Sequence, residues 1–564
     1  MPGPLSDAQF AGLAGGHGDA GTVDVLRGGQ QGRRRLLTVA AARAYGGDPL
    51  VRDGLELLTR AERADPLAVA EVLAHPPLTG WARAAIAGPA DAGYLAAVAA
   101  AAATRAGLAF ELTLPCPDGT LLLPTLGGAV GLTPGPTVVS AGHGTVRVVA
   151  GDGSARWLPV RRITPASGVE VSIEDQDPWR QRYHHPPTPR LAAADAADLA
   201  RLTGQAWRWL RGHLPAHADG LTGLLRSLVP LRPPPSGHAV SATSRDALGA
   251  IALSVPADPK TLALLLVHEL QHTKLGALLD LVPLHHPGGP ARYRAPWRLD
   301  PRPVGALLQG AYAHLGVAEV WRCRRAEGVH AAFEFAYWRE QTARAVRQLA
   351  AATELTDAGR TFTAGMAHTL RGWREPVDTR VEAAVRDVAD GGAVRWGLTN
   401  LRPHPDEVDR AVRAWRRGEP RPGSGPPPTV APGPAAPALA AGTGPEAAVR
   451  GRLLAGDTDP STMDSFDRAY AAGDAEGALH GYQRRLRDDP GDTDAWVGLA
   501  LAARLTGNAA ATRALVTRPD LVREAHRALP DADPLALAAW CLDTAPQPGP
   551  AAVNRDGGPG TARG

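Results

Sequence analysis

The sequence predicts an α+β fold that is mostly helical, with one small antiparallel sheet region and a helical-repeat domain near its C-terminal end. Apolar residues recur at helical spacing over most of the 564 residues. Between about 108 and 175 the period changes to two, which is typical of strands. A segment rich in Pro, Gly and Ala at 418–447 sets the last helical region apart, so we expect several domains.

The composition narrows the class of protein before any motif is considered. Hydrophobic residues make up 44% of the chain, enough for a sizeable core, and the net charge is only +3 with histidine neutral. The charges are interspersed, so neither nucleic acid nor a membrane is indicated as a partner. Cys116, Cys323 and Cys541 are too far apart for a disulfide framework or a cysteine metal site. With no signal-peptide pattern and no long apolar run, we expect a cytoplasmic protein.

Two regions precede the part of the chain that carries the chemistry. Residues 1–107 are predicted to form an N-terminal helical region. Residues 108–175 are predicted to form an antiparallel β region, in which segments 110–114 and 120–123 flank the turn sequence Pro117-Asp118-Gly119. Two alternating segments joined by a turn of this composition predict a hairpin.

The region 176–400 is the predicted catalytic domain, and a helix over 258–280 is its centre. Asp258 is a typical N-cap, and Pro259 suits the first helical position, where a missing N–H costs nothing. The helix carries His268-Glu269-x-x-His272 within an apolar surface. Residues four apart lie one turn apart on the same face, so both imidazoles can reach one metal ion.

Glu269 lies beside the first of these histidines, where it could hold a water molecule or a proton. The alternative is a polar cluster hydrogen-bonded within the core. Two histidines and a glutamate in an apolar helix need partners, and this favours a metal site. A strand is predicted at 248–254, directly before the helix. Because this order is the arrangement of zincin sites, we expect a zincin-like helix–strand core.

A second helix, predicted over 307–321, offers a third ligand. His314 lies on an apolar face of that helix, where it could equally be a core histidine with its own hydrogen bonds. Glu319 is the alternative ligand. Five residues correspond to about 500° around a helix, so the two side chains point in different directions and cannot both face one ion.

Two reactions fit a pair of histidines with a third ligand. In zinc hydrolysis, Glu269 would deprotonate a metal-bound water. In non-haem Fe(II) chemistry, the same ligands leave positions for a 2-oxo acid and O₂, and an arginine must hold the far carboxylate of that acid. Arg298 and Arg302, in the loop between the two helices, are candidates for this role, although each could be an ordinary loop arginine.

Residues 448–546 are predicted to form a tetratricopeptide-like helical domain. Gly473 and Gly507 are separated by 34 residues, the length of such a unit, and the surrounding residues match one to two degenerate units. These repeats usually bind partners, although packing against the main body is an equal alternative. The tail, 547–564, has a disordered composition.

Several segments taken together resemble the His-Glu-x-x-His peptide-modification proteins of ribosomal-peptide biosynthesis. The resemblance covers about residues 10–400. The segments that carry it are Ser241-Ala-Thr-Ser-Arg, Ile251-Ala-Leu-Ser, His268-Glu-Leu-Gln-His272-Thr-Lys-Leu, Arg292-Tyr-Arg-Ala-Pro-Trp-Arg-Leu-Asp-Pro-Arg-Pro and Gly310-Ala-Tyr-Ala-His-Leu.

The resemblance implies an Fe(II)- and 2-oxoglutarate-dependent hydroxylase that acts at a β-carbon of a residue in a precursor peptide. His268 and His272 then match the paired ligands, Glu269 the motif acid, and His314 the third ligand, with Glu319 as its alternative. Family members are often fused to a radical S-adenosylmethionine cyclophane synthase. This chain has no cluster of three cysteines, so we expect such a synthase only as a separate partner.

Two other functions stay open. A zinc-dependent metallopeptidase acting on a peptide would use the same motif with Zn²⁺ as its only cofactor. A non-catalytic protein could instead bind and deliver a peptide through its C-terminal repeats.

Overall fold

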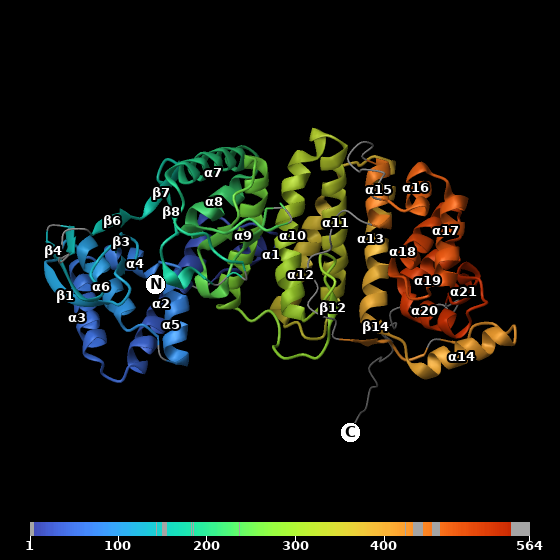
Figure 1. Cartoon of the computed structure of the whole chain (residues 1–564), viewed down its shortest axis with the longest axis horizontal. Helices are drawn as coiled ribbons and strands as arrows, with labels where there is room; N and C mark the ends of the chain where they lie inside the picture. The colour runs from blue at the N-terminus through green and yellow to red at the C-terminus, as the bar shows by residue number, and fades with distance from the viewer. Residues whose placement is uncertain are drawn as a thin grey trace, which may run out of the picture. The chain divides into compact units, whose positions relative to one another are not determined.

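The computed structural model describes residues 5–542 except 89, 143, 149–154, 182, 184, 236, 238, 424, 432–443 and 454–462. The chain forms two compact units (Figure 1). The first unit contains Met1–Tyr293 and Arg302–Asp378, and the second contains Arg294–Pro301 and Thr379–Gly564. The short strands β12 (Tyr293–Arg294) and β13 (Pro301–Arg302) lie where the chain passes between the units. The predicted tail at 547–564 lies outside the described residues.

The N-terminal helical region is confirmed. It contains α1 (Asp7–Ala14), α2 (Ala20–Ala44), α3 (Pro49–Ala64), α4 (Pro66–Leu73), α5 (Pro77–Ala87) and α6 (Gly93–Arg105). Aspartates cap three of these helices: the side chains of Asp19, Asp48 and Asp65 accept hydrogen bonds from backbone N–H groups of the first turn. The alanine-rich α6 is buried along almost its whole length, because small side chains let α3 and α4 approach it closely.

Strands follow where the period of two predicts them. Strands β1 (Phe110–Cys116), β4 (Gly135–Gly142) and β5 (Thr145–Val148) form one antiparallel sheet, and β2 (Thr120–Leu123), β3 (Gly127–Val130) and β6 (Arg156–Pro159) form another. The predicted hairpin across 117–119 is wrong, because β1 pairs with β4 whereas β2 pairs with β3. The turn itself exists, with Gly119 at φ +74°, but its backbone packs on the Leu132 carbonyl and leads the chain from one sheet into the other.

The last two strands of the predicted β region belong to a mixed five-stranded sheet. They are β7 (Arg161–Ala166) and β8 (Val169–Ile173), and the sheet order is β10-β11-β9-β8-β7. Strands β8, β9 (Ser227–Pro230) and β11 (Ala250–Leu253) are parallel. The two outer strands, β7 and β10 (Ser241–Ala242), are antiparallel to their neighbours. Helices α7 (Ala193–His213) and α8 (Pro215–Leu224) lie between β8 and β9 in the chain, as a parallel crossover requires.

Helix α9 (Pro259–Leu279) follows β11 directly, as predicted. The Asp258 carboxylate caps it by accepting from the backbone N–H groups of Lys260 and Thr261. Helix α9 packs against α7, α8 and α10 (Val304–Arg324). Figure 1 shows α9, α10, α11 (Val329–Ala350) and α12 (Asp357–Gly372) near one another in the green to yellow part of the chain. The buried strand β11 and the helices around α9 fix the position of that helix.

From Thr379 on, the described residues of the second unit are helical apart from one pair of short strands, β14 (Leu401–Arg402) and β15 (Thr429–Val430). Its first long helix, α13 (Thr379–Asn400), packs on α15 (Pro445–Leu453) and α18 (Thr493–Leu505). The predicted catalytic domain, 176–400, therefore ends too late, because residues 379–400 belong to the second unit. Helical periodicity shows that such a helix has an apolar face but does not show which neighbour covers it.

The region predicted as tetratricopeptide-like is confirmed as helical. It contains α15, α16 (Ser465–Ala472), α17 (Ala475–Asp488), α18, α19 (Ala509–Thr517), α20 (Pro519–Ala528) and α21 (Pro534–Trp540). Gly473 and Gly507 both have left-handed φ angles, +83° and +77°, and both end a helix. Each is followed by the N-cap of the next helix, Asp474 or Asn508. The 34-residue spacing thus corresponds to a repeated structural position; the kinship to tetratricopeptide proteins stays a prediction.

Helix α14 (Pro405–Arg416) ends just before the predicted linker, 418–447. Strand β15 lies inside this linker, and α15 begins near its end, at Pro445. None of the helices in the described part of the chain is both long and apolar enough to cross a lipid bilayer.

Candidate metal centre

The two motif histidines are partly exposed within an otherwise buried stretch of helix α9. From Leu266 to Leu278, every residue except His268 and His272 is buried. The two imidazole rings lie 4.9 Å apart between centroids, as expected for side chains one turn apart on one face. Because the rest of this stretch packs into the core, the backbone that carries both rings is held firmly.

Helix α10 brings His314 to the same place. The His314 ring lies 5.2 Å from the His268 ring and stacks on Trp338 of α11, with 4.6 Å between ring centroids. Its Nδ1 donates to the Gly310 carbonyl at 2.8 Å, which leaves the lone pair of the neutral ring on Nε2. The structure therefore brings together the three histidines that the sequence singled out.

Hydrogen bonds orient a second imidazole in the same way. The Nδ1 of His272 lies 3.1 Å from Oε1 of Gln309, the residue next to Gly310 on α10. With Nδ1–H donating to this amide oxygen, the His272 lone pair is also on Nε2. Ligand histidines in metalloproteins are usually oriented by an acceptor on the far ring nitrogen, so this pattern suits a metal site.

Burial keeps two of the three rings neutral. Desolvation lowers the pKa of His268 to about 4, against a smaller opposing effect of the Glu269 carboxylate. Desolvation also lowers the pKa of His314 well below its ordinary value, and the neighbouring His268 adds to that shift. A metal ligand must offer a lone pair, so two rings that are neutral at pH 7 need lose no proton to bind a cation.

Glu269 is buried and only partly satisfied. Its Oε1 accepts from the Ser241 hydroxyl of β10 at 2.7 Å and lies 3.9 Å from Nε2 of His268. Its Oε2 is buried and has no hydrogen-bond partner among the residues that the structure describes. A buried carboxylate oxygen without a partner is costly, and a metal ion or a metal-bound water would remove that cost.

These side chains line an open cleft of about 390 Å³. Its walls come from α9, from Gln309 of α10, and from β10 with the turn that follows it. The lining residues are Ser241, Ala242, Thr243, Ser244, Arg245, Leu248, His268, Glu269, His272, Gly276 and Gln309. Arg245 is the one cation among them, and its guanidinium donates to Asp280 at 2.5 Å.

The two arginines predicted to bind the 2-oxo acid are not among the lining residues. Arg298 belongs to the second unit, where its Nε donates to Asp300 at 2.7 Å. Arg302 belongs to the first unit and lies on β13. A position between the two ligand helices in the sequence therefore did not identify Arg245, the arginine that lines the cleft.

Glu319, the alternative third ligand, lies in a different cluster. Its carboxylate accepts from Nε2 of His17 at 3.0 Å and from Nε2 of His217 at 2.9 Å. Within the described part of the chain, His17, His217 and Glu319 are the one set of three whose ligand atoms all lie within 4.8 Å of one another. Ligands of one ion at about 2.0–2.2 Å cannot be further apart than about 4.4 Å, so the ligand atoms of His268, His272 and His314, which do not all lie within 4.8 Å of one another, must move closer together to bind one ion.

Sequence reasoning missed three of these residues. His17 and His217 occur in no recognised motif and come from segments 200 residues apart, so only the fold unites them with Glu319. Arg245 belongs to a segment that carries the family resemblance, but the sequence predicts no function for it. Its place three residues after the edge strand β10 was the available signal.

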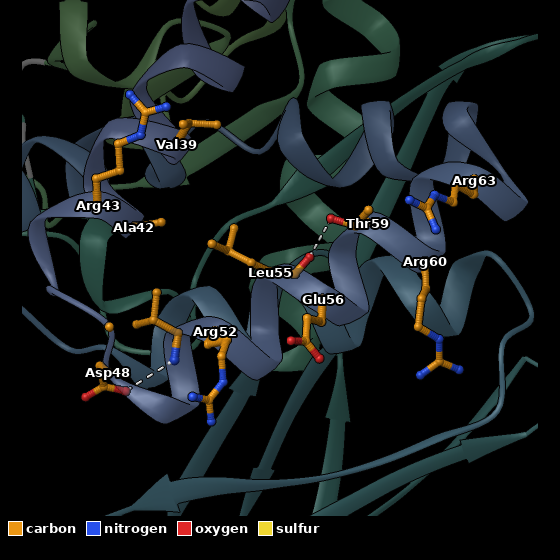
Figure 2. Close-up of a pocket in the computed structure, with 12 residues that line it drawn as sticks. Val39, Ala42, Arg43, Asp48, Arg52, Leu55, Glu56, Thr59, Arg60 and Arg63 are labelled. Carbon is orange, nitrogen blue, oxygen red and sulfur yellow. Dashed lines mark hydrogen bonds between the residues drawn. The ribbon is translucent and has the colours of Figure 1, made fainter.

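A second cleft, of about 630 Å³, lies between α2 and α3. Figure 2 shows Arg52, Arg60 and Arg63 projecting from α3 and Arg43 from α2, beside apolar side chains such as Leu55. Its lining includes no histidine or cysteine. The described lining of this cleft therefore lacks the imidazole and thiolate ligands of a transition-metal site, and the histidine cleft is the better candidate for a metal centre.

No protein-family model matches the chain, and no curated protein is significantly similar to it.

Proposed function

We propose that the chain is an Fe(II)- and 2-oxoglutarate-dependent hydroxylase that adds a hydroxyl group at a β-carbon of a residue in a ribosomally made precursor peptide. The observation that carries the proposal is the convergence of His268, His272 and His314, the first two of which line an open cleft. Two of these rings are held by acceptors on Nδ1, so their Nε2 atoms are the ligand atoms.

Three protein ligands suit this chemistry because they leave coordination positions open. A bound Fe(II) ion with 2-oxoglutarate would supply the oxidation of a C–H bond by O₂, with conversion of the 2-oxo acid to succinate and CO₂. The protein's part is to hold the ion with three imidazoles, to place a cation for the far carboxylate, and to fix the peptide. Glu269 lies beside the ion's position, where its Oε2 would accept a hydrogen bond from a bound water.

Arg245 is the arginine best placed for the 2-oxo acid. It lines the cleft that contains His268 and His272, whereas Arg298 and Arg302 do not. Its partner Asp280 holds the side chain without burying it, because 59% of the Arg245 side chain remains exposed. A guanidinium group binds a carboxylate through two parallel hydrogen bonds, so it can fix both the position and the orientation of the co-substrate.

The edge strand β10 suits a peptide substrate. It pairs with β11 on one side and is the outer strand of the five-stranded sheet. Ser241 and Ala242 of this strand also line the cleft. An extended peptide that pairs with such an edge would pass the histidines. The same order, an antiparallel edge strand beside parallel strands and then the ligand helix, supports a zincin-like core.

A zinc metallopeptidase is the second candidate, and Glu269 favours it. The residue occupies the position of a hydrolytic base, and its unpartnered Oε2 could take a proton from a zinc-bound water. A third candidate, a peptide-delivery protein, would depend on the second unit and not on the cleft. Deletion of 448–564 would then abolish peptide processing while His268→Ala would leave it unchanged.

One experiment separates the two enzymes. The chain is freed of metal, reconstituted without O₂ with Fe(II), 2-oxoglutarate and a synthetic candidate precursor peptide, and then exposed to air. We expect one added oxygen atom in the peptide and one succinate per event, with no reaction when Zn²⁺ replaces Fe(II). Peptide cleavage that needs zinc but no O₂ would overturn the proposal in favour of the peptidase.

A further inference from the structure

We propose that His17, His217 and Glu319 form a second metal site, separate from the cleft, for a divalent first-row transition ion such as Zn²⁺. The site would fasten the segment between α1 and α2 to helices α8 and α10. All of these elements belong to the first unit.

The donor atoms already have the spacing of ligands on one ion. Nε2 of His17 lies 3.0 Å and 3.2 Å from the two carboxylate oxygens of Glu319, and Nε2 of His217 lies 2.9 Å from Oε2. Two ligands of a tetrahedral zinc ion at about 2.0–2.1 Å are about 3.3 Å apart. The two His–Glu distances would widen by a few tenths of an ångström to admit the ion, with the proton of each imidazole on Nδ1, and the donor atoms of all three residues lie within 4.8 Å of one another.

The donor types suit such an ion. Two imidazoles and one carboxylate bind zinc or ferrous iron and leave at least one position for water. The His17 side chain is 40% exposed, whereas those of His217 and Glu319 are 1% and 10% exposed. Solvent therefore reaches the cluster from the His17 side, which provides both an entry path and the remaining ligand.

The segment that carries His17 is held in place by contacts other than the carboxylate. Gly16 has φ +97°, and a Cβ there would lie 3.1 Å from Cδ2 of Leu315 on α10. The Gly16 carbonyl accepts from Nε2 of Gln271 at 3.1 Å and from Nζ of Lys274 at 2.7 Å. These bonds fix the backbone beside His17 against α9 and α10, so the three donors converge without an ion to draw them together.

The ligands come from distant parts of the sequence. Glu319 is 302 residues from His17 and 102 residues from His217. An ion that binds this set only in the folded chain stabilises the fold according to its affinity and concentration. Binding of the ion would therefore raise the stability of the first unit and leave the reaction at the cleft unchanged.

The same distances also fit a hydrogen-bonded His–Glu–His cluster without an ion, and metal counting separates the two states. The full chain is stripped with a chelator, loaded with Zn²⁺, desalted and analysed for bound zinc. We expect two equivalents in the native chain, one in Glu319→Gln, one in His272→Ala and none in the double variant. Zinc should also raise the unfolding temperature of His272→Ala but not that of the double variant.

Glu319→Gln keeps the size and hydrogen-bonding capacity of the side chain, and circular dichroism checks its fold. Should that variant misfold, His17→Gln at the exposed end of the cluster gives the same readout. His368→Gln, an exposed histidine of α12, is the matched control and should keep both equivalents. The site is refuted if the native chain and the folded cluster variant bind the same amount of zinc. Because the cleft ion is lost separately through His272→Ala, failure of one site leaves the other testable.

Discussion

Helix α10 contributes a side chain to each of two histidine clusters, and the two differ in nearly every physical property. His314 lies beside the two motif histidines, which line an open cleft together with Glu269, and Oε2 of Glu269 has no partner among the described residues. Glu319, five residues further on, lies in a tight and mostly buried cluster in which Oε1 accepts a hydrogen bond from His17 and Oε2 accepts one from His217. A reaction centre must keep room and unsatisfied groups for its substrates, whereas a structural site closes around its ligands. The cleft therefore has the features of a reaction centre, and the cluster of His17, His217 and Glu319 is closer to a structural site.

The variants with the largest expected effects each remove one histidine from one of the two clusters. We expect His272→Ala to lower peptide hydroxylation on the order of a thousandfold or more, because the iron loses a ligand. His217→Ala should leave the turnover of the folded protein within a few fold. It should lower the free energy of unfolding by about 1.5–3 kcal/mol, since a buried carboxylate loses a charged hydrogen bond.

Steady-state turnover and urea unfolding, measured on both variants, check these two outcomes. An inactive but stable His217→Ala variant would contradict the division into a reactive and a structural cluster.

Arg245 offers the next largest effect. Replacing Arg245 with Gln should raise the KM for 2-oxoglutarate about 10–150-fold, because a charged hydrogen bond contributes about 1.5–3 kcal/mol. The measurement is succinate formation at varied 2-oxoglutarate with the peptide held constant. Arg298→Gln and Arg302→Gln are the matched controls, since neither residue lines the cleft. A larger rise in KM for either control variant would show that Arg298 or Arg302, and not Arg245, binds the far carboxylate of 2-oxoglutarate.

Glu269 distinguishes the two enzyme classes more gradually. In the hydroxylase, Glu269→Gln should reduce activity or iron affinity about 10–100-fold, as expected for a group that supports the ligands without being one. In a peptidase the same change removes the base and should abolish turnover. Iron content and the rate of succinate formation, measured together, show which applies. Ser241→Ala, which removes the hydrogen bond to Oε1, should have a smaller effect in the same direction.

The last prediction concerns stability and not activity, and its subject is Lys274, which lies beside the second cluster. Burial lowers its pKa from 10.5 to about 7, against a smaller opposing effect of Glu319. Between about pH 7 and 10 the unfolded chain therefore binds a proton that the folded chain has lost, and the free energy of unfolding rises with pH. The slope is at most about 1.4 kcal/mol per pH unit.

Urea unfolding of the metal-free chain at stepped pH values measures this slope. Lys274→Met should flatten it. Lys260→Met removes the other lysine of the sequence, which is partly exposed and paired with Glu327, and should leave the slope unchanged. Equal slopes for the native chain and Lys274→Met would show that the buried amine stays charged.

The motif and its helix could be predicted because their signals are local. An N-cap, a first-turn proline and two histidines one turn apart all lie within one stretch, and α9 begins where Asp258 predicts. His314 could be named from its apolar helical face, and the structure brings it to the motif. Periodicity also located the strands, although it could not show that β1 and β2 pair with different partners.

The rest depends on contacts between distant segments. The pairing of Glu319 with His17 and His217 joins residues that are hundreds of positions apart, and no local pattern marks such a pair. Arg245 lines the cleft because it follows β10 in the chain. Only the sheet order shows that β10 is an edge strand beside the ligand helix. For the same reason α13 was assigned to the wrong unit, since its periodicity does not identify the helices that cover it.

The most direct test of the cleft's role follows isotopically labelled O₂ into the products. The chain with Fe(II), 2-oxoglutarate and its precursor peptide should place one labelled oxygen atom in the peptide and one in succinate. His268→Ala should place none in either, while Glu319→Gln should behave as the native chain does. Unlabelled peptide fragments formed with zinc and without O₂ would contradict the account and identify the cleft as the site of a peptidase.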